Sequence, residues 1–207
     1  MTQSSILFIV SAPSGAGKTS LLRALLERDP QLRLSVSHTT RPMRPGERDG
    51  VDYHFVDVDT FQKLVAEGAF IEHAQVFDNY YGTAEQAVRD QLAAGHDVVV
   101  EIDWQGARQV RARFPDAVSI FIAPPSIEAL RERLGARGQD SEEVIARRMR
   151  DARAELSHYP EYDYLVINDD FDTALEQLGQ VVGAERLRTT RQAIRHAAAL
   201  SAMLDGD

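Results

Sequence analysis

The sequence predicts an α/β fold built around a mainly parallel sheet. Short apolar runs, each the length of a buried strand, alternate with stretches in which apolar residues recur at helical spacing. The 207 residues are enough for one domain with a substantial core. One segment, residues 34–82, breaks the alternation, because it holds short strands, a loop rich in Pro, Gly and Arg, and one brief helix. We therefore expect a parallel core with a small inserted sheet.

Composition narrows the class of protein. Hydrophobic residues make up 43% and charged residues 27%, which is typical of globular domains. The chain has no cysteine, which excludes disulfides, thiolate metal sites and a cysteine nucleophile. A net charge of −9 argues against binding to nucleic acid or anionic membranes. Because no apolar run approaches 18 residues and the start lacks a basic signal region, we expect a soluble, cytoplasmic protein with small-molecule partners.

The individual elements follow from the positions of the apolar residues. The first strand is expected at residues 5–10, and the spacing of Leu21, Leu22, Leu25 and Leu26 indicates the first helix. Six later apolar runs are expected to be strands: residues 34–37, 53–56, 70–77, 97–102, 118–123 and 164–168. Helical patterns lie between and after them, near residues 59–67, 84–94, 104–113, 126–135, 141–157 and 171–200.

A few residues indicate where these helices begin and end. Gly68 and Gly95 stand where C-terminal caps belong, and Ser126 suits an N-cap. Asp140 and Glu143 have the spacing of a capping box at the next helix start. These signals agree with the helix boundaries taken from periodicity.

A glycine-rich loop follows the first strand and precedes the first helix. It reads Ser11-Ala12-Pro13-Ser14-Gly15-Ala16-Gly17-Lys18-Thr19, which matches G-x-x-x-x-G-K-[ST] except that Ala12 replaces the first glycine. Glycines let the backbone curl its N–H groups around phosphate, and the next helix adds its positive N-terminal end. Lys18 would bridge the β- and γ-phosphates, and Thr19 would bind Mg²⁺. The sequence therefore predicts a nucleoside triphosphate site, with a chance glycine-rich turn as the alternative.

A second acidic feature ends an apolar strand. Residues 98–103 finish with Glu101 and Asp103, at the edge of an α/β sheet where ligands bind. The two carboxylates suit the metal side of a phosphate site. The alternative is that they cap the helix that starts near Trp104, and the sequence leaves both interpretations open.

Two segments are locally basic within this acidic chain. Residues 39–50 hold three arginines against two acids, and residues 131–153 hold seven against five. The planar guanidinium suits phosphate oxygens, so these segments favour local anion sites. On the helix expected at 141–157, Arg148 and Arg153 flank the apolar stripe on opposite sides. Helical geometry alone does not choose between them.

A longer pattern starts at Thr39. It reads Thr39-Thr40-Arg41-x-x-Arg44-x-x-Glu47-x-x-Gly50-x-x-Tyr53-x-Phe55-Val56. Further motifs follow in order: Asn79-Tyr80-Tyr81-Gly82, Ile102-Asp103-x-Gln105-Gly106, Ala123-Pro124-Pro125-Ser126, Arg137-Gly138 and Asn168-Asp169-Asp170. Together with the glycine-rich loop, they make the chain resemble the guanylate kinases, a family of P-loop nucleoside monophosphate kinases, from about residue 4 to 184.

The resemblance implies an activity and an architecture. The implied reaction transfers the γ-phosphoryl group of ATP to GMP, giving ADP and GDP, and it depends on Mg²⁺. The implied fold is a P-loop core with a mainly parallel sheet flanked by helices, a mixed-sheet GMP-binding insertion and a helical lid. The implied divisions are a core of residues 4–33, 84–125 and 158–184, an insertion of 34–83, a lid of about 126–157 and a C-terminal helical extension of 185–207.

The resemblance also implies roles for individual residues. The GMP residues would be Arg41, Arg44, Tyr53 and Tyr81 on the phosphate, Ser37, Glu72 and Thr83 on guanine, and Glu101 and Asp103 beside them. The ATP residues would be 11–19 and Asn168, and the transfer itself would use Lys18, Arg41, Arg137 and Arg148. The resemblance thus selects Arg148 over Arg153. The family usually has aspartate where this chain has Glu101, which leaves the role of that residue open.

The proposed base contact also makes chemical sense independently of the family. A carboxylate at Glu72 can accept both N–H donors on the edge of guanine, which adenine lacks, and such a site can reject the wrong base by roughly 10⁴.

Two other classes of protein share parts of this pattern. A related kinase acting on a ribose bisphosphate would need no base contact, which Glu72 and Thr83 argue against. A non-catalytic domain that binds phosphoproteins typically lacks the phosphate loop and the lid arginines, which are present here. The basic terminal helix is interpreted as docked on the core or as a contact between copies of the chain, so a homo-oligomer is left open.

Overall fold

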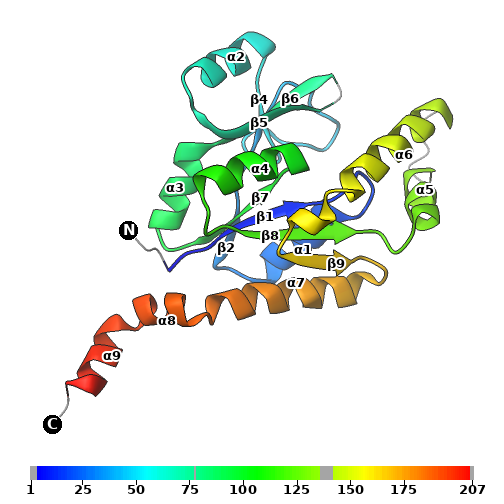
Figure 1. The fold of residues 1–207 in the computed structure, drawn as a ribbon. Helices are drawn as coiled ribbons and strands as arrows, with labels where there is room; N and C mark the ends of the chain where they lie inside the picture. Colours follow the sequence, from blue (N-terminus) through cyan, green and yellow to red (C-terminus); the bar gives the residue numbers. More distant parts are fainter. Residues whose placement is uncertain (1–3, 77, 136–141, 206–207) are drawn as a thin grey trace.

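Two sheets of different construction build the molecule (Figure 1). The computed structural model describes residues 4–76, 78–135 and 142–205. The strands are β1 (Leu7–Ser11), β2 (Leu32–Leu34), β3 (His38–Thr39), β4 (His54–Phe55), β5 (Phe70–Val76), β6 (Asn79–Ala84), β7 (Asp97–Glu101), β8 (Val118–Ala123) and β9 (Tyr164–Ile167). The helices are α1 (Lys18–Arg28), α2 (Val58–Ala66), α3 (Glu85–Ala93), α4 (Trp104–Arg113), α5 (Ile127–Gly135), α6 (Glu142–Leu156), a 3₁₀ turn η1 (Tyr159–Glu161), α7 (Phe171–Arg186), α8 (Thr189–Arg195) and α9 (Ala197–Leu204).

The larger sheet is parallel throughout. Its strand order is β2-β7-β1-β8-β9, and every neighbouring pair is parallel. The last residues of adjacent strands therefore lie along one edge: Val10 of β1 pairs with Glu101 of β7, and Ser11 pairs with Phe121 of β8. This edge carries the segments that follow the strands, including the glycine-rich loop. The parallel core predicted from the sequence is confirmed.

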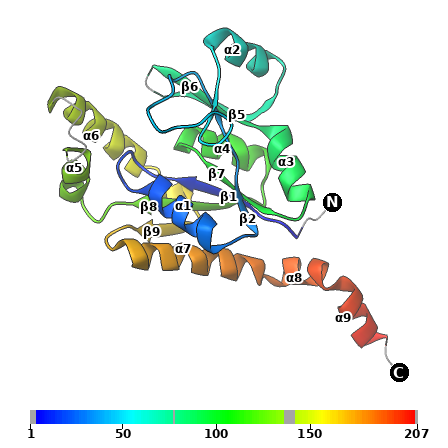
Figure 2. The ribbon, with the colours of Figure 1, turned by 180° about the vertical axis from the view of Figure 1, so that it is seen from behind.

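Helices cover both faces of the parallel sheet. Because side chains alternate along a strand, Phe8 and Val10 of β1 pack with α1 and α7, while Leu7 and Ile9 pack with α3 and α4. The two faces make two separate apolar clusters, and Figures 1 and 2 show α7 beneath the sheet and α3 and α4 above it. The near-continuous apolar sequences of β1 and β8 follow from burial on both sides.

The smaller sheet is mixed and lies within the expected insertion. Its order is β4-β3-β6-β5, with β5 and β6 antiparallel and β3 and β4 parallel. The β5–β6 register sets Glu72 opposite Thr83. On the far side of this sheet, Phe61 of α2 is fully buried and stacks on Phe70 with ring centroids 4.8 Å apart.

Most expected elements are confirmed, and 118–123 matches β8 at both ends. The strands β3 and β6 were not predicted, because β3 has two residues and β6 (N-Y-Y-G-T-A) has no apolar run. The strand predicted at 34–37 is wrong over most of its length, since β2 ends at Leu34. Ser35 still donates its N–H to Val99, but the Ser37 carbonyl already accepts from His54 N, so the chain crosses between sheets within three residues.

The predicted caps are confirmed where the structure describes them. Ser126 Oγ accepts from Ala129 N at 3.1 Å at the start of α5. Gly68 and Gly95 have φ of 67° and 89°, the left-handed values that end a helix favourably at glycine. Of the capping box predicted at Asp140 and Glu143, Asp140 falls outside the described residues and Glu143 lies in the first turn of α6, so the box stays a prediction.

The helical pattern predicted over 171–200 is confirmed, but three helices in succession occupy that stretch. Arg188 leaves helical geometry, with φ −54° and ψ 134°, and His196 makes the second break. Beside the first break, the buried carboxylate of Glu185 pairs with Arg188, at 3.0 Å, and with Arg191, at 2.9 Å, which satisfies that buried charge.

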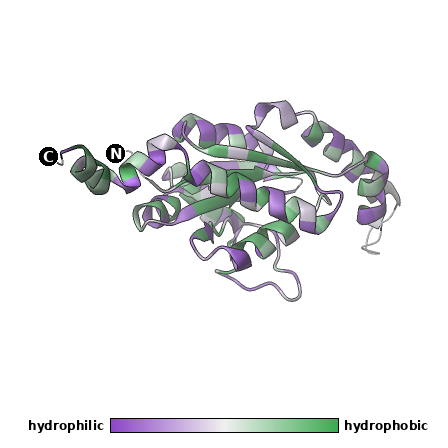
Figure 3. Cartoon of the chain, turned by 90° about the horizontal axis from the view of Figure 1, so that it is seen from below, coloured by the Kyte–Doolittle hydropathy of each residue, from purple (hydrophilic) through white to green (hydrophobic). Residues whose placement is uncertain are grey.

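The last helix, α9, projects away from the body in all three views (Figures 1–3). Figure 3 colours it largely hydrophobic, and Met203 and Leu204 are 75% and 86% exposed. No helix in the described part of the chain is long and apolar enough to cross a membrane.

Candidate nucleotide site

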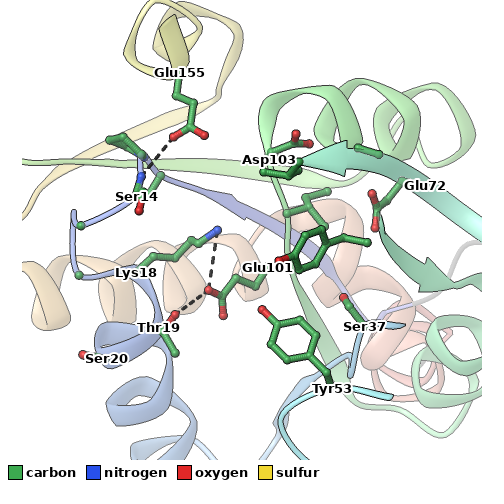
Figure 4. Close-up of a pocket in the computed structure, with 18 residues that line it drawn as sticks. Ser14, Lys18, Thr19, Ser20, Ser37, Tyr53, Glu72, Glu101, Asp103 and Glu155 are labelled. Carbon is green, nitrogen blue, oxygen red and sulfur yellow. Dashed lines mark hydrogen bonds and ion pairs between the residues drawn. The ribbon is translucent and has the colours of Figure 1, made fainter. Parts of the chain in front are cut away.

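A cavity of about 300 Å³ lies between the carboxyl edge of the parallel sheet and the smaller sheet (Figure 4). It is lined by Ala12, Pro13, Ser14, Gly15, Gly17, Lys18, Thr19, Ser20, Ser37, Tyr53, Glu72, Ala74, Val76, Tyr81, Glu101, Ile102, Asp103 and Glu155. Most of the predicted site residues are therefore brought together. Figure 4 shows Glu155 and Ser14 at one end, Glu72 and Ser37 at the other, and Lys18 between them.

The glycine-rich loop has the shape that a phosphate loop requires. Gly15 and Gly17 both have φ of +90°, which residues with a side chain rarely adopt. The turn closes through Ala16 N, which donates to Pro13 O at 3.1 Å, and Lys18 then begins α1. The strand, loop and helix succeed one another as the sequence predicts, so the loop presents its N–H groups and the positive end of α1 to the cavity.

Asn168 supports this loop from beneath rather than lining the cavity. Its Nδ2 donates to Ala16 O at 2.7 Å, and its side chain is buried. A Cβ at Gly17 would collide with this amide, so the glycine is required for close approach as well as for its φ. Ser11, at the end of β1, is buried below the loop in the same way.

Glu101 connects the two polar side chains of the phosphate loop. Its Oε1 accepts from Thr19 Oγ1 at 2.8 Å and lies 3.7 Å from Lys18 Nζ. Asp103, two residues later, accepts from Gly106 N at 2.8 Å and caps α4. The sequence left open whether these carboxylates belong to a phosphate site or cap a helix. Glu101 faces the phosphate loop, whereas Asp103 caps α4 and also lines the cavity.

At the other end of the cavity, three predicted guanine contacts form a hydrogen-bonded chain. Thr83 Oγ1 donates to Glu72 Oε1 at 2.6 Å, and Ser37 Oγ lies 3.1 Å from Thr83 Oγ1. Thr83 and Glu72 come from the paired strands β6 and β5, and both side chains are buried. The smaller sheet therefore sets this chain rigidly, and Thr83 acts behind Glu72 without lining the cavity.

Burial dominates the electrostatics of Glu72. It raises the pKa of this carboxyl to about 7, while the hydrogen bond from Thr83 acts in the opposite direction. Gly106 on α4 leaves the room that the carboxylate needs, because a Cβ there would lie 2.6 Å from Glu72 Oε2. The second carboxylate oxygen is thus confined by α4 and the first by β6.

Two tyrosines stand between the ends of the cavity. The rings of Tyr53 and Tyr81 meet edge to face with centroids 6.1 Å apart. Burial, with a further contribution from Glu101, raises the pKa of Tyr53 to about 12. Its hydroxyl therefore stays protonated near neutral pH and can donate to an anion.

The two arginines expected to contact the GMP phosphate, Arg41 and Arg44, are not among the residues that line the cavity. Arg41 makes a two-pronged ion pair with Glu47, at 2.7 and 3.0 Å, and its guanidinium lies 5.5 Å from the Tyr53 ring centroid. The same carboxylate accepts from Arg44 N at 2.7 Å, while the Arg44 side chain is exposed. The hydrogen bond from Arg41 is the main reason why the pKa of Glu47 is lowered.

The predicted lid is described in part. Ala152 of α6 packs with Leu130 and Leu134 of α5 in a small apolar cluster, so the expected apolar stripe is confirmed there. Arg148 is partly buried and Arg153 is exposed, and neither lines the cavity. Arg137 falls outside the described residues.

Glu155 also lines the cavity, and the sequence patterns did not predict it. It lies near the C-terminal end of α6, lines the cavity, and accepts from Ser14 N at 3.2 Å. At 100° per residue, Glu155 flanks the apolar stripe of α6 on the same side as Arg148, so helical geometry could have indicated it as a candidate. What the sequence does not show is that α6 packs beside the phosphate loop.

The donor set suits a hard cation that is shared with phosphate. No group of three or more His, Cys, Asp or Glu side chains that could hold a metal occurs among the described residues. Mg²⁺ is usually bound by one or two protein oxygens together with substrate phosphates, and the Thr19 hydroxyl with the Glu101 carboxylate offers such oxygens beside the phosphate loop. The residues present therefore fit Mg²⁺ carried with a nucleotide.

Comparison with known proteins gives consistent matches. The family model described as guanylate kinase matches residues 4–185. A guanylate kinase of Chromohalobacter salexigens is 63% identical over 198 residues, 96% of this chain and 92% of that protein, and one of Vibrio cholerae is 57% identical over 200 residues, 96% and 97%. The crystal structure of guanylate kinase from Anaplasma phagocytophilum superposes with a TM-score of 0.77 at 35% identity, covering 92% of this chain and 91% of that one. The family match includes every residue that lines the cavity.

Proposed function

The chain belongs to the guanylate kinase family, and from that premise we propose how its residues divide the work of the reaction. It is an enzyme that transfers the γ-phosphoryl group of ATP to GMP, giving ADP and GDP. The alternatives weighed from the sequence, a sugar-phosphate kinase and a non-catalytic binding domain, are not favoured. The observation that carries the residue roles is one cavity with a phosphate loop at one end and the Glu72–Thr83–Ser37 chain at the other.

The phosphate-loop end receives ATP in this proposal. Residues 12–19 surround the phosphates, with free backbone N–H groups of the loop as donors, and Lys18 neutralises charge on the β- and γ-phosphates. Asn168 holds the loop through Ala16, which supports a positioning role beside the adenine contact implied by the family. Glu101 keeps Lys18 and Thr19 at fixed places before the phosphates arrive.

The other end receives GMP. The ionised Glu72 accepts the N1 and 2-amino N–H groups of guanine, and Thr83 and Ser37 orient it. Tyr53 and Tyr81 donate to the GMP phosphate, which lies toward Lys18. Arg41 joins them by turning from Glu47, and Arg44 joins them with its exposed side chain, while its backbone N–H stays on the Glu47 carboxylate. Asp103 lies between the two substrates.

Phosphoryl transfer needs no covalent intermediate with the protein. The residues therefore act by positioning the two substrates and by neutralising charge. The proposed division keeps the core at 4–33, 84–125 and 158–184, the GMP-binding insertion at 34–83, the lid at about 126–157 and the extension at 185–207. Arg137 and Arg148 of the lid complete the charge around the moving phosphoryl group. Thr19, with Glu101 beside it, would hold Mg²⁺ together with the nucleotide, and the ion would supply charge neutralisation there.

The proposal extends to the location of the enzyme and to its oligomeric state. ATP and GMP support a cytoplasmic location. The exposed apolar residues of α9 support contact with a second copy of the chain, and analytical ultracentrifugation of the wild type and Leu204→Asp tests this, since the substitution should lower the oligomeric state.

The residue roles are tested by a coupled assay of ADP formation. Wild-type protein with ATP and Mg²⁺ should turn over GMP and leave AMP, UMP and ribose 1,5-bisphosphate unused. Lys18→Met should lose at least about 10³-fold in kcat while keeping the thermal unfolding curve of the wild type. Wild-type-like turnover in that variant would refute the assignment of the phosphate loop.

A further inference from the structure

One carboxyl group in the cavity has no part in the assigned chemistry. Glu155 Oε2 accepts from the backbone N–H of Ser14, which is 141 residues away in sequence. Figure 4 shows this carboxylate aimed at the phosphate loop from α6, at the end of the cavity away from Glu72. This hydrogen bond links the lid helix to the loop directly.

The contact puts an acidic group where the loop binds anions. The N–H groups of a phosphate loop and the first turn of α1 create a positive field that phosphate and carboxylate both favour. Lys18 also faces Glu155 and favours its charged form. When ATP brings its own negative charge to this loop, the phosphates and an ionised Glu155 repel each other and compete for the same donors.

The surroundings of Glu155 make it easy to displace. Burial raises the pKa of its carboxyl to about 7, Asp103 and Asp151 add to the rise, and Lys18 and the Ser14 N–H oppose it. Near neutral pH the carboxyl therefore carries a proton part of the time, which weakens its hold on the N–H group. Moved into water, it would return to the ordinary value of 4.5 and release that proton.

The helix that carries Glu155 is anchored just after it. The His158 ring stacks on Trp104 of α4 with centroids 3.9 Å apart, and His158 Nδ1 lies 2.7 Å from Glu161. Arg148 stands about two turns before Glu155 on the same helix. Ala152 of α6 also packs on Leu130 and Leu134 of α5, and beside this apolar packing the Glu155–Ser14 bond is a polar contact between the helix and the loop.

We propose that the Glu155 carboxylate holds α6 against the phosphate loop in the absence of ATP, and that the phosphates of ATP displace it from Ser14. Displacement frees the helix that carries Arg148, so the arrival of ATP is coupled to movement of the lid. The proposal rests on the assignment of ATP to the phosphate loop and is independent of how GMP is bound.

The test measures binding of a non-hydrolysable ATP analogue with Mg²⁺ by calorimetry at pH 7, in two buffers that differ in ionisation enthalpy. Binding to the wild type should release about half a proton more than binding to Glu155→Gln, because the displaced carboxyl ionises fully in water. The comparison with Glu155→Gln subtracts protons that come from the analogue itself. Glu132→Gln, an exposed glutamate of α5, is the matched control and should behave like the wild type.

Kinetics give a second readout. Glu155→Ala removes the competing acceptor, so the KM for ATP should fall about 2- to 10-fold, the equivalent of one net hydrogen bond, while the KM for GMP stays the same. Proton uptake instead of release, equal proton numbers in the wild type and Glu155→Gln, or a higher or unchanged KM for ATP in Glu155→Ala would each overturn the proposal. Should Glu155→Ala fail to fold, the near-isosteric Glu155→Gln still decides through the proton count.

The two assignments fail in different ways. If Lys18→Met binds the analogue as tightly as the wild type, then ATP does not use the loop as assigned. If Lys18→Met loses binding but Glu155→Gln releases as many protons as the wild type, the loop assignment stands and the role of Glu155 is wrong.

Discussion

Each end of the cavity holds a carboxyl group with a raised pKa, but the two groups are held in place by different contacts. Glu72 and Glu155 both have a pKa of about 7, and burial is the main cause in each. Glu72 is confined by Thr83 on a paired strand and by Gly106 on a helix, whereas Glu155 makes one hydrogen bond to a backbone N–H on a different element. Similar electrostatics thus accompany a rigid site in one case and a single breakable contact in the other. A fixed group suits base recognition, and a displaceable one suits coupling to ATP.

The largest expected difference between the two carboxyl groups is in substrate choice. Glu72→Ala leaves the N–H donors of guanine without an acceptor, so the ratio of kcat/KM for GMP over AMP should fall by about 10²- to 10⁴-fold. Glu155→Ala should leave that ratio unchanged, because it acts at the other end of the cavity. Steady-state kinetics with both acceptors measure it, and an unaltered preference for GMP in Glu72→Ala would show that Glu72 does not contact the base.

The confinement of Glu72 by α4 gives the next effect. Gly106→Ala puts a methyl carbon 2.6 Å from Glu72 Oε2, so the carboxylate must move and kcat/KM for GMP should fall about 10- to 100-fold. Alanine favours helix over glycine by up to about 1 kcal/mol, so helix propensity does not weaken folding, and a thermal unfolding curve measures any cost of the close contact.

A matched variant isolates the contact with Glu72. Gly179→Ala makes the same change in α7, where nothing lies within 4 Å of the new Cβ, and it should leave kinetics unchanged. Binding of the ATP analogue should be equal in both variants. If Gly106→Ala and Gly179→Ala behave alike, then Gly106 does not position Glu72.

Features set by neighbouring residues could be predicted from the sequence, whereas contacts between distant elements could not. The phosphate loop is local, since nine consecutive residues between a strand and a helix specify it, and its geometry is as expected. The Glu72–Thr83 pair was expected only through the family resemblance, because β6 lacks an apolar run and its pairing with β5 is set by the fold. Glu155 was not predicted at all, because its contact joins elements far apart in the chain.

The C-terminal region shows the same limit. Periodicity predicted a helical pattern over 171–200 but not the breaks at Arg188 and His196. Nor did it predict that Glu185 is buried there, where it pairs with Arg188 and accepts from Tyr164 OH at 2.6 Å. A sequence pattern reports which residues are apolar but not which buried charge will need partners.

The raised pKa values of Glu72 and Glu155 should both make the free energy of unfolding depend on pH. Each has a folded pKa raised from 4.5 to about 7, so between these values the folded protein keeps a proton that the unfolded chain has lost. The free energy of unfolding should therefore fall as pH rises from about 4.5 to 7, by at most about 3 kcal/mol for Glu72 and by less for the more exposed Glu155.

Urea unfolding at pH 5 and pH 8 measures this loss. Glu72→Gln should remove the larger share of the difference and Glu155→Gln the smaller. Equal losses in the wild type and both variants would mean that neither carboxyl is protonated in the folded protein at pH 5 to 7.

The smallest expected effect comes from the hydroxyl behind Glu72. Thr83→Val removes the donor that favours the ionised carboxylate, so the rise of kcat/KM for GMP with pH should move to higher pH. Loss of this buried hydrogen bond should also cost about 1 kcal/mol of stability. Thr173→Val is the matched control, because Thr173 Oγ1 donates at 2.7 Å to Asp170, an N-cap away from the cavity. A profile that shifts equally in both variants, or in neither, would mean that Thr83 does not set the charge of Glu72, and the rigidity of the guanine end would then rest on Gly106 and the β5–β6 register alone.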